Sequence, residues 1–413
     1  MFKNYFKIAI AVLRRRKFFT FISLFGISLT LTIVMVLASF VDHLVSAGYP
    51  DTERERELYV NSLRLMSSKK GYSNTGPASF YFLNTYVSKL KTPERLAIAS
   101  IYVPTNTYVN NKKLVINLKY TNDQYWDVLK YEFLEGKPFN KTQLTNAERI
   151  AVISEETRDN YFGKGVTATG KYLETDNIQY RVIGVVKNVP VTRVFFYGDM
   201  YLPYTLSKTN LDDKNLTGTF TAILQAKDKA DLPKIKEEYN QMVSRIPRTD
   251  KEFDLIYSYA DTYLESFTRM MPFSTPGSSG ITIFYTIIAI FFLLFLLLPT
   301  LNLVNINISR IMERSSEIGV RKAFGASSKT LVYQFITENL ILTFIGSLVG
   351  IILSFIIIQV INHSDLIAHA DLKINFNVLL YSLVATLVFG LLSGVYPAWR
   401  MSRLQVVKAL KAQ

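Results

Sequence analysis

The chain has 413 residues, of which 49% are hydrophobic and only 19% are charged, a balance that argues against an ordinary soluble protein. It contains no cysteine, which excludes disulfides, thiolate metal sites and thiol nucleophiles. The formal net charge is +14, and residues 1–18, 305–335 and 397–413 account for all but one of these charges. Basic residues gathered beside apolar runs are typical of the cytoplasmic side of membrane spans, so the charge gives no reason to expect nucleic-acid binding.

Four apolar runs are long enough to cross a bilayer core of about 30 Å as helices. The runs 19–41, 281–301, 340–361 and 376–396 contain no Asp, Glu, Lys, Arg or His. The basic segments place both termini and the loop 302–335 in the cytoplasm. The predicted fold class is therefore a membrane α-helical protein with four transmembrane helices and a large α+β extracytoplasmic domain inserted between helices 1 and 2.

The first segment, 1–18, is amphipathic at helical period and predicts an elbow helix in the headgroup layer. A cleaved signal peptide is the competing interpretation, because small residues follow at 46–48, but the apolar run is longer than a typical signal sequence has. The remaining segments are transmembrane helix 1 at 19–41, the extracytoplasmic domain at 42–280, transmembrane helix 2 at 281–304, a cytoplasmic segment at 305–335, transmembrane helix 3 at 336–361, an outer loop at 362–375, transmembrane helix 4 at 376–396, and a cytoplasmic tail at 397–413.

The extracytoplasmic domain begins with a dense run of charges between Asp51 and Glu57, which we interpret as a helical stalk or a solvated connection. Strands are predicted at 96–103 and in a hairpin that pairs 107–109 with 114–118 around Asn110 and Asn111. A short helix follows at 122–129.

The second half of this domain contains clearer local signals. A strand at 149–153 leads into a helix capped by Ser154 and ended by Gly163. A second hairpin turns at 176–177, between 170–174 and 178–186. An amphipathic helix covers 231–246, and 190–225 shows too little periodicity to assign. These elements predict a mixed α+β domain, with two lobes as one arrangement.

A flexible connecting segment rich in Pro and Gly, at 272–280, leads the chain back to the membrane. Pro299 is expected to kink transmembrane helix 2 near its inner end. Two small-xxx-small pairs are expected to let helices pack closely. They are Gly346 with Gly350, and Gly390 with Gly394.

Two sequence patterns suggest chemistry that we do not expect to find. Residues 165–171 match most of a phosphate-binding loop, but Tyr172 stands where Ser or Thr is needed, and the segment follows a helix and precedes a strand. His363, Asp365, His369 and Asp371 could bind a metal if they shared one face, but a polar outer loop explains them equally well. We therefore predict no catalytic activity, no metal and no cofactor for this chain.

The cytoplasmic segment contains a predicted short helix whose acidic and basic residues recur at i,i+4 spacing, as in Glu313, Glu317 and Arg321. Gly325 ends it. A solvated connector that only fixes topology would show the same pattern, and that interpretation remains open.

Residues 313–327 read Glu-Arg-Ser-Ser-Glu-Ile-Gly-Val-Arg-Lys-Ala-Phe-Gly-Ala-Ser, which resembles the cytoplasmic segment of FtsX-like and MacB-like ABC transporter permeases. Residues 133–190 resemble the periplasmic core domain of MacB-like permeases, and 396–411 resemble the end of the same proteins. The resemblance implies that the segment docks on an ATPase subunit. The residues it assigns to this coupling role are Glu313, Arg314, Glu317, Ile318, Gly319, Arg321, Lys322, Phe324 and Gly325.

The resemblance implies the permease subunit of a bacterial ABC transporter in the cytoplasmic (inner) membrane, which exports or extracts a peptide, antibiotic or lipoprotein-like substrate. The alternative is a non-transporting transducer that regulates a cell-wall hydrolase. The implied partners are a cytoplasmic ABC ATPase dimer that binds the ATP, a second permease copy in a homodimer or heterodimer, and membrane lipid. A periplasmic adaptor or outer-membrane partner is compatible with both functions.

Overall fold

The computed structural model describes residues 10, 11, 14, 15, 17–109, 112–247, 252–313, 320, 324, 327–364, 367–369 and 371–402. The chain divides into two compact units. The helical unit comprises residues 1–43, 285–366 and 371–413, and the core domain comprises residues 44–284 and 367–370.

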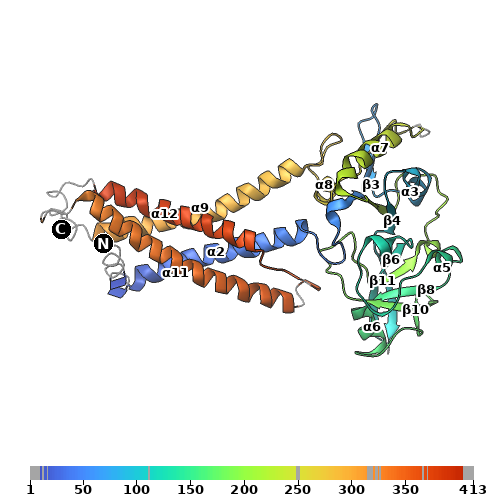
Figure 1. Cartoon of the computed structure of the whole chain (residues 1–413), viewed down its shortest axis with the longest axis horizontal. Helices are drawn as coiled ribbons and strands as arrows, with labels where there is room; N and C mark the ends of the chain where they lie inside the picture. Colours follow the sequence, from blue (N-terminus) through green and yellow to red (C-terminus); the bar gives the residue numbers. More distant parts are fainter. Residues whose placement is uncertain are drawn as a thin grey trace. The chain divides into compact units, whose positions relative to one another are not determined.

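Long helices make up the described part of the helical unit (Figure 1). They are α2 (Lys17–Val45), α9 (Ile281–Glu313), α11 (Ser328–His363) and α12 (Phe376–Ser402). Among the described residues, Lys17–Val45 and Val332–His363 are long and apolar enough to cross a membrane, and Ile281–Leu297 and Leu379–Ser393 form shorter apolar stretches. The predicted apolar runs thus all lie on helices, and the number of membrane spans stays a prediction.

A mixed sheet organises the core domain, and ten strands of it fall within the described residues. In spatial order they begin with β1 (Glu57–Val60), β12 (Phe220–Gln225), β4 (Arg95–Ser100) and β6 (Lys112–Thr121). The order continues with β11 (Met200–Pro203), β8 (Ile150–Ser154), β10 (Ile178–Val186) and β7 (Phe133–Gly136). Off this path, β5 (Val103–Val109) pairs with β6, and β9 (Tyr172–Thr175) pairs with β10.

A smaller sheet and short helices complete the described part of this domain. The small sheet has the order β13 (Leu255–Ser258), β2 (Leu63–Met66) and β3 (Ser73–Gly76). The α-helices are α3 (Phe80–Thr85), α4 (Tyr125–Val128), α5 (Lys141–Thr145), α6 (Glu155–Phe162), α7 (Leu232–Ser244) and α8 (Tyr263–Arg269). The 3-10 turns are η1 (Arg54–Arg56), η2 (Val87–Lys89), η3 (Tyr204–Leu206) and η4 (Lys229–Asp231).

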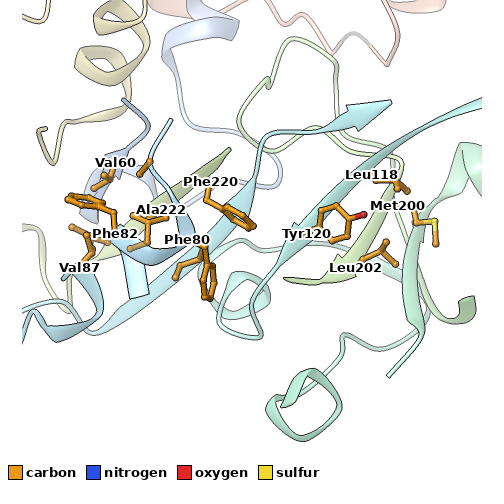
Figure 2. Close-up of a cluster of buried hydrophobic side chains, with 14 of the residues drawn as sticks. Val60, Phe80, Phe82, Val87, Leu118, Tyr120, Met200, Leu202, Phe220 and Ala222 are labelled. Atoms are coloured by element: carbon orange, nitrogen blue, oxygen red, sulfur yellow. The ribbon is translucent and has the colours of Figure 1, made fainter. Parts of the chain in front are cut away.

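The large sheet is buried on both faces, each of which is covered by its own hydrophobic cluster. Successive side chains on a strand point to opposite faces, so one strand contributes to both clusters. On β1, Leu58 and Val60 join one hydrophobic cluster, while Tyr59 joins the other. On β11, Met200 and Leu202 likewise face away from Tyr201. Figure 2 shows the first of these clusters, with Phe80 and Phe82 of α3 packed beside the strands. Two buried faces explain why these strands read as apolar runs in the sequence.

The large sheet is joined by a short register at one place. Between β4 and β6 the register contains a single pair, Ala99 with Thr121. One hydrophobic cluster nevertheless extends from the strands β1, β12 and β4 to the strands from β6 to β10, so the arrangement in two lobes stays a prediction.

Several local predictions are confirmed. Ser154 caps α6 by accepting the N–H of Thr157, and Gly163 follows the helix with a φ of 103°. The β9–β10 hairpin turns at Asp176 and Asn177, which both have positive φ. The predicted amphipathic helix is α7.

Other predictions need correction. The strand predicted at 96–103 is split between β4 and β5, and 190–225, left unassigned, contributes β11 and β12. The predicted helix at 122–129 is limited to α4. The first hairpin pairs as predicted, with Thr107 opposite Leu114, while its turn lies outside the described residues. The stalk predicted at 51–57 is not present: Arg54–Arg56 forms the short turn η1, and Asp51, Arg54 and Glu57 are buried.

Candidate functional site

Two of the predicted coupling residues lie within the described chain. Glu313 is the last residue of α9, and Phe324 lies in a turn with 88% of its surface exposed. A large aromatic side chain this exposed is available to a partner. The predicted residues Arg314, Glu317, Ile318, Gly319, Arg321, Lys322 and Gly325 lie outside the described residues.

The predicted packing glycines occupy close approaches between helices. A Cβ added to Gly346 would lie 2.8 Å from Cγ2 of Ile27, and one added to Gly350 would lie 2.9 Å from the carbonyl oxygen of Ser28, both in α2. At Gly390 of α12, the added Cβ would lie 2.6 Å from the hydroxyl of Thr343 in α11. These separations are too short for any other residue type without movement.

The two other predicted packing residues are only partly described. Gly394 lies on α12, and its surroundings fall outside the description. The backbone of α9 stays helical through Pro299. Whether Pro299 kinks the helix stays a prediction.

Hydroxyl side chains in the helical unit bond mainly to the backbone of their own helix. Ser354 donates to the carbonyl of Gly350 at 2.6 Å, and Thr32 donates to the carbonyl of Ser28 at 2.7 Å and also reaches the carbonyl of Gly350 in α11 at 3.2 Å. Thr386 donates to the carbonyl of Ser382 at 2.8 Å. Bonds of this kind satisfy the hydroxyl within one turn.

Sequence reasoning missed Glu338, which lies on α11 and is only 1% exposed. Its carboxylate accepts a hydrogen bond from Gln334 at 3.1 Å. The signal was available, because Glu338 lies inside the segment 336–361 predicted to span the membrane, where an acid marks a functional position by default.

The charged run at 51–57, predicted to be a stalk or a solvated connection, instead has three of its charges, those of Asp51, Arg54 and Glu57, buried in the core domain, while Glu55 is exposed. Asp51 is fully buried, Glu57 is 1% exposed and Arg54 is 9% exposed. The guanidinium of Arg54 donates to Asp51 at 2.7 Å and to the carbonyls of Val45 and Ser46 at 2.7 and 2.8 Å. Val45 is the last residue of α2, so Arg54 caps a helix end as well as pairing with an acid.

Distant parts of the chain complete this network. Arg193 also donates to the carbonyl of Ser46, at 2.8 Å. The ring of Tyr263, the first residue of α8, lies 3.5 Å below the guanidinium carbon of Arg54. We name this network the joint. Its members are Val45, Ser46, Asp51, Arg54, Glu57, Tyr59, Arg193 and Tyr263.

Gly48 lies against Arg193, because an added Cβ would lie 2.5 Å from Nη2 of Arg193 and would require that side chain to move. Through Arg54, the joint connects the segment that follows α2 with α8, the helix that precedes α9 in the chain. Both segments connect the core domain to long helices.

An acid pair gives the joint its electrostatic character. The hydroxyl of Tyr59 donates toward Asp51 at 2.9 Å or Glu57 at 2.8 Å. Burial, together with the charge of Asp51, raises the pKa of Glu57 to about 9. Glu57 is therefore protonated at neutral pH.

A second ion pair lies beside the joint. Arg269, the last residue of α8, donates to both carboxylate oxygens of Asp261, and its guanidinium carbon lies 3.9 Å from the ring centroid of Tyr259. Burial raises the pKa of Asp261 despite these bonds. The backbone of Asp261 exchanges two hydrogen bonds with Tyr59, which attaches this pair to β1.

Each described member of the four residues considered as a metal site bonds to a group outside that set. The imidazole of His369 pairs with Glu156 at 2.7 Å, while that of His363 bonds to the carbonyl of Gln359. Asp371 pairs with Lys373, and Asp365 lies outside the described residues.

Comparisons with known proteins identify the family. The model of the MacB-like periplasmic core domain matches residues 20–242, which is more than half of the chain, and the model of the FtsX-like permease C-terminal region matches residues 266–406. The chain therefore belongs to the family of FtsX-like ABC transporter permeases with a MacB-like core domain. Proteins of this family are inner-membrane permeases with a periplasmic domain.

Individual relatives are distant. The uncharacterized ABC transporter permease YvrN of Bacillus subtilis is 25% identical over 70% of this chain and 68% of its own length. The macrolide export ATP-binding/permease protein MacB 2 of Yersinia pestis is 23% identical over 73% of this chain and 42% of its own length. Among solved structures, the periplasmic region of MacB from Actinobacillus actinomycetemcomitans covers 53% of this chain and 94% of that chain, at 15% identity and a TM-score of 0.36.

Proposed function

We propose that the chain is the membrane subunit of an ABC transporter that couples ATP hydrolysis by a separate cytoplasmic ATPase dimer to a change of shape in the core domain. The observation that carries this proposal is the joint, in which Arg54 bonds to the end of α2 and stacks on the first residue of α8. A displacement of either connecting segment acts on the same buried arginine. Such a network transmits movement better than a solvated stalk would.

The helical unit supports a mechanical role rather than a polar route for a solute. A polar solute that crosses between helices needs side chains that replace its water, since each unsatisfied group in hydrocarbon costs several kcal/mol. The hydroxyls of Thr32, Ser354 and Thr386 already bond to their own helix backbone, and the buried carboxylate of Glu338 already accepts a hydrogen bond from Gln334 of the same helix. We infer that the substrate is acted on outside the membrane, by the core domain.

The proposed topology has four spans, both termini in the cytoplasm and the core domain outside. The chain has no cysteine, so single introduced cysteines report on topology cleanly. We expect a Cys in place of Ser73 to react with an impermeant thiol reagent in cells with a permeabilised outer envelope, and a Cys in place of Ser328 not to react. Labelling of both positions, or the reverse pattern, contradicts the four-span topology.

The substrate class and the other partners are also part of the proposal. Relatives named as macrolide and pyoverdine exporters favour export or extraction over regulation of a cell-wall hydrolase. A second permease copy is expected because each site of an ATPase dimer needs a docking surface. Co-purification followed by mass spectrometry tests these partners, including any periplasmic adaptor.

The docking site on the ATPase is proposed to be the segment 313–325. Reversing the charges of Glu317 and Arg321 together is expected to weaken ATPase association while membrane insertion is unchanged. The matched control reverses Glu237 and Lys234 on the exposed side of α7 in the core domain. Wild-type association in the 317/321 double variant would show that the segment is only a connector.

A further inference from the structure

A cleft of about 430 Å³ opens in the core domain, lined by residues of β4 and by the residues that follow β6. This volume lies within the range of small-molecule sites, about 300–1,000 Å³. The side chains of Phe80, Ile98, Leu144 and Leu224 form a buried apolar floor. The rim carries charges of both signs.

Two of these rim charges have no partner among the described residues. Asp123 follows β6 and Lys141 begins α5, and within the described chain neither side chain makes an ion pair or a hydrogen bond. By contrast, Glu94 pairs with Arg56 at 3.3 Å, and Arg95 donates to Gln225 at 3.4 Å. An acid and a base thus remain available at the rim of an apolar floor.

A peptide cannot bind in this cleft as an added β-strand, because the backbone groups of β4 that line it already have partners. The N–H groups of Leu96 and Ile98 donate to the side chains of Gln124 and Asn122 at 2.8 and 3.0 Å. The carbonyl of Leu96 accepts from the side chain of Asn122, and the carbonyl of Ile98 accepts from the backbone N–H of Asn122. The edge of β4 is therefore already paired, so recognition must come from the floor and the rim charges.

We propose that this cleft binds a zwitterionic amphipathic molecule of the size of a tripeptide, with an apolar group on the floor, its ammonium at Asp123 and its acid group at Lys141. The opposite charges on the rim select the two ends, and the apolar floor selects bulky side chains over polar ones. The proposal that the cleft binds such a molecule does not depend on the proposed export function. Its use for cargo rests on the proposed export function.

The test uses the full chain in lipid nanodiscs and the probe tripeptide Leu-Phe-Leu with free ends, titrated by NMR. The blocked form, acetylated at its N-terminus and amidated at its C-terminus, is the matched ligand. We expect the free form to bind at least about fivefold more tightly, and Asp123→Asn and Lys141→Gln each to weaken it about threefold to tenfold. Ser88→Trp, which fills the cleft from its exposed rim, is expected to abolish binding.

The control variants are Asp212→Asn and Lys164→Gln, which remove the same charges at exposed positions that do not line the cleft. Thermal unfolding confirms that each variant is folded. Absence of binding at millimolar peptide, equal binding of the blocked form, or binding unaffected by all three cleft variants would overturn the proposal. None of these results affects association with the ATPase, so failure here is distinguishable from failure of the proposed function.

Discussion

The core domain and the helical unit bury polar side chains in opposite ways. In the helical unit, Ser354 and Thr386 bond to a carbonyl one turn earlier in the same helix. In the joint, Arg54 bonds to residues from the end of α2 and from the loop before β1, and it stacks on α8. A polar group satisfied within its own helix travels with that helix, whereas one satisfied between segments resists their separation. Under the proposed function, the helices move and the joint transmits their movement.

Breaking the joint should have the largest effect. Arg54→Met leaves Asp51 buried without its cation, and removing one member of a buried pair costs about 3–5 kcal/mol. Thermal or denaturant unfolding of the core domain in the full chain measures the loss. Arg245→Met, at an exposed position on the same domain, should change stability by less than about 0.5 kcal/mol. Equal losses of stability in the two variants would show that Arg54 contributes no more to the core domain than an exposed arginine.

Replacing Glu57 by Gln should change how the stability of the core domain depends on pH. The carboxyl has a pKa of 4.5 in the unfolded chain and about 9 in the folded one, so between these values the folded state holds the extra proton. Stability is therefore fully present below pH 4.5 and is lost as the pH rises toward 9. Glu57→Gln should flatten this slope and stabilise the domain at pH 8 by about 1–3 kcal/mol. An unchanged slope of unfolding free energy against pH would contradict the buried acid pair.

Close packing in the helical unit gives the next effect. Gly350→Ala places a Cβ against the backbone of α2 and should destabilise the unit by about 1–3 kcal/mol. Gly26→Ala is the matched control, because its added Cβ would have no neighbour within 4 Å, and it should be neutral or stabilising. Unfolding in mixed detergent compares the two variants. Destabilisation of equal size would mean that the glycines act through backbone flexibility and not through contact.

Removing a hydroxyl that bonds within one helix should have the smallest effect. Ser354→Ala deletes a bond to the carbonyl of Gly350, and the carbonyl remains part of the helix, so the expected cost is below about 1 kcal/mol. The same unfolding assay measures it. A loss as large as that of Arg54→Met would erase the difference between the two units.

The features that sequence predicted best are those that neighbouring residues decide. The cap at Ser154 and the turn at Asp176 and Asn177 depend on bonds within a few residues, and both are confirmed. The joint was missed because the charges at 51–57 resemble a solvated run, and their partners are far away in the chain. Arg193 lies 147 residues after Ser46, whose carbonyl it holds. A sequence pattern contains no sign of such a partner.

The central claim, that the joint carries ATP-driven movement into the core domain, is tested most directly by electron-spin distance measurement. A spin label on Cys at position 73, in the assembly with its ATPase, should show an inter-copy distance that changes with ATP. Arg54→Lys keeps the charge but cannot hold Asp51, Val45 and Ser46 together, so it should retain ATPase binding and lose this change, while Arg245→Lys keeps it. An ATP response that is absent in the unmodified joint, or unaltered by Arg54→Lys, would contradict the account.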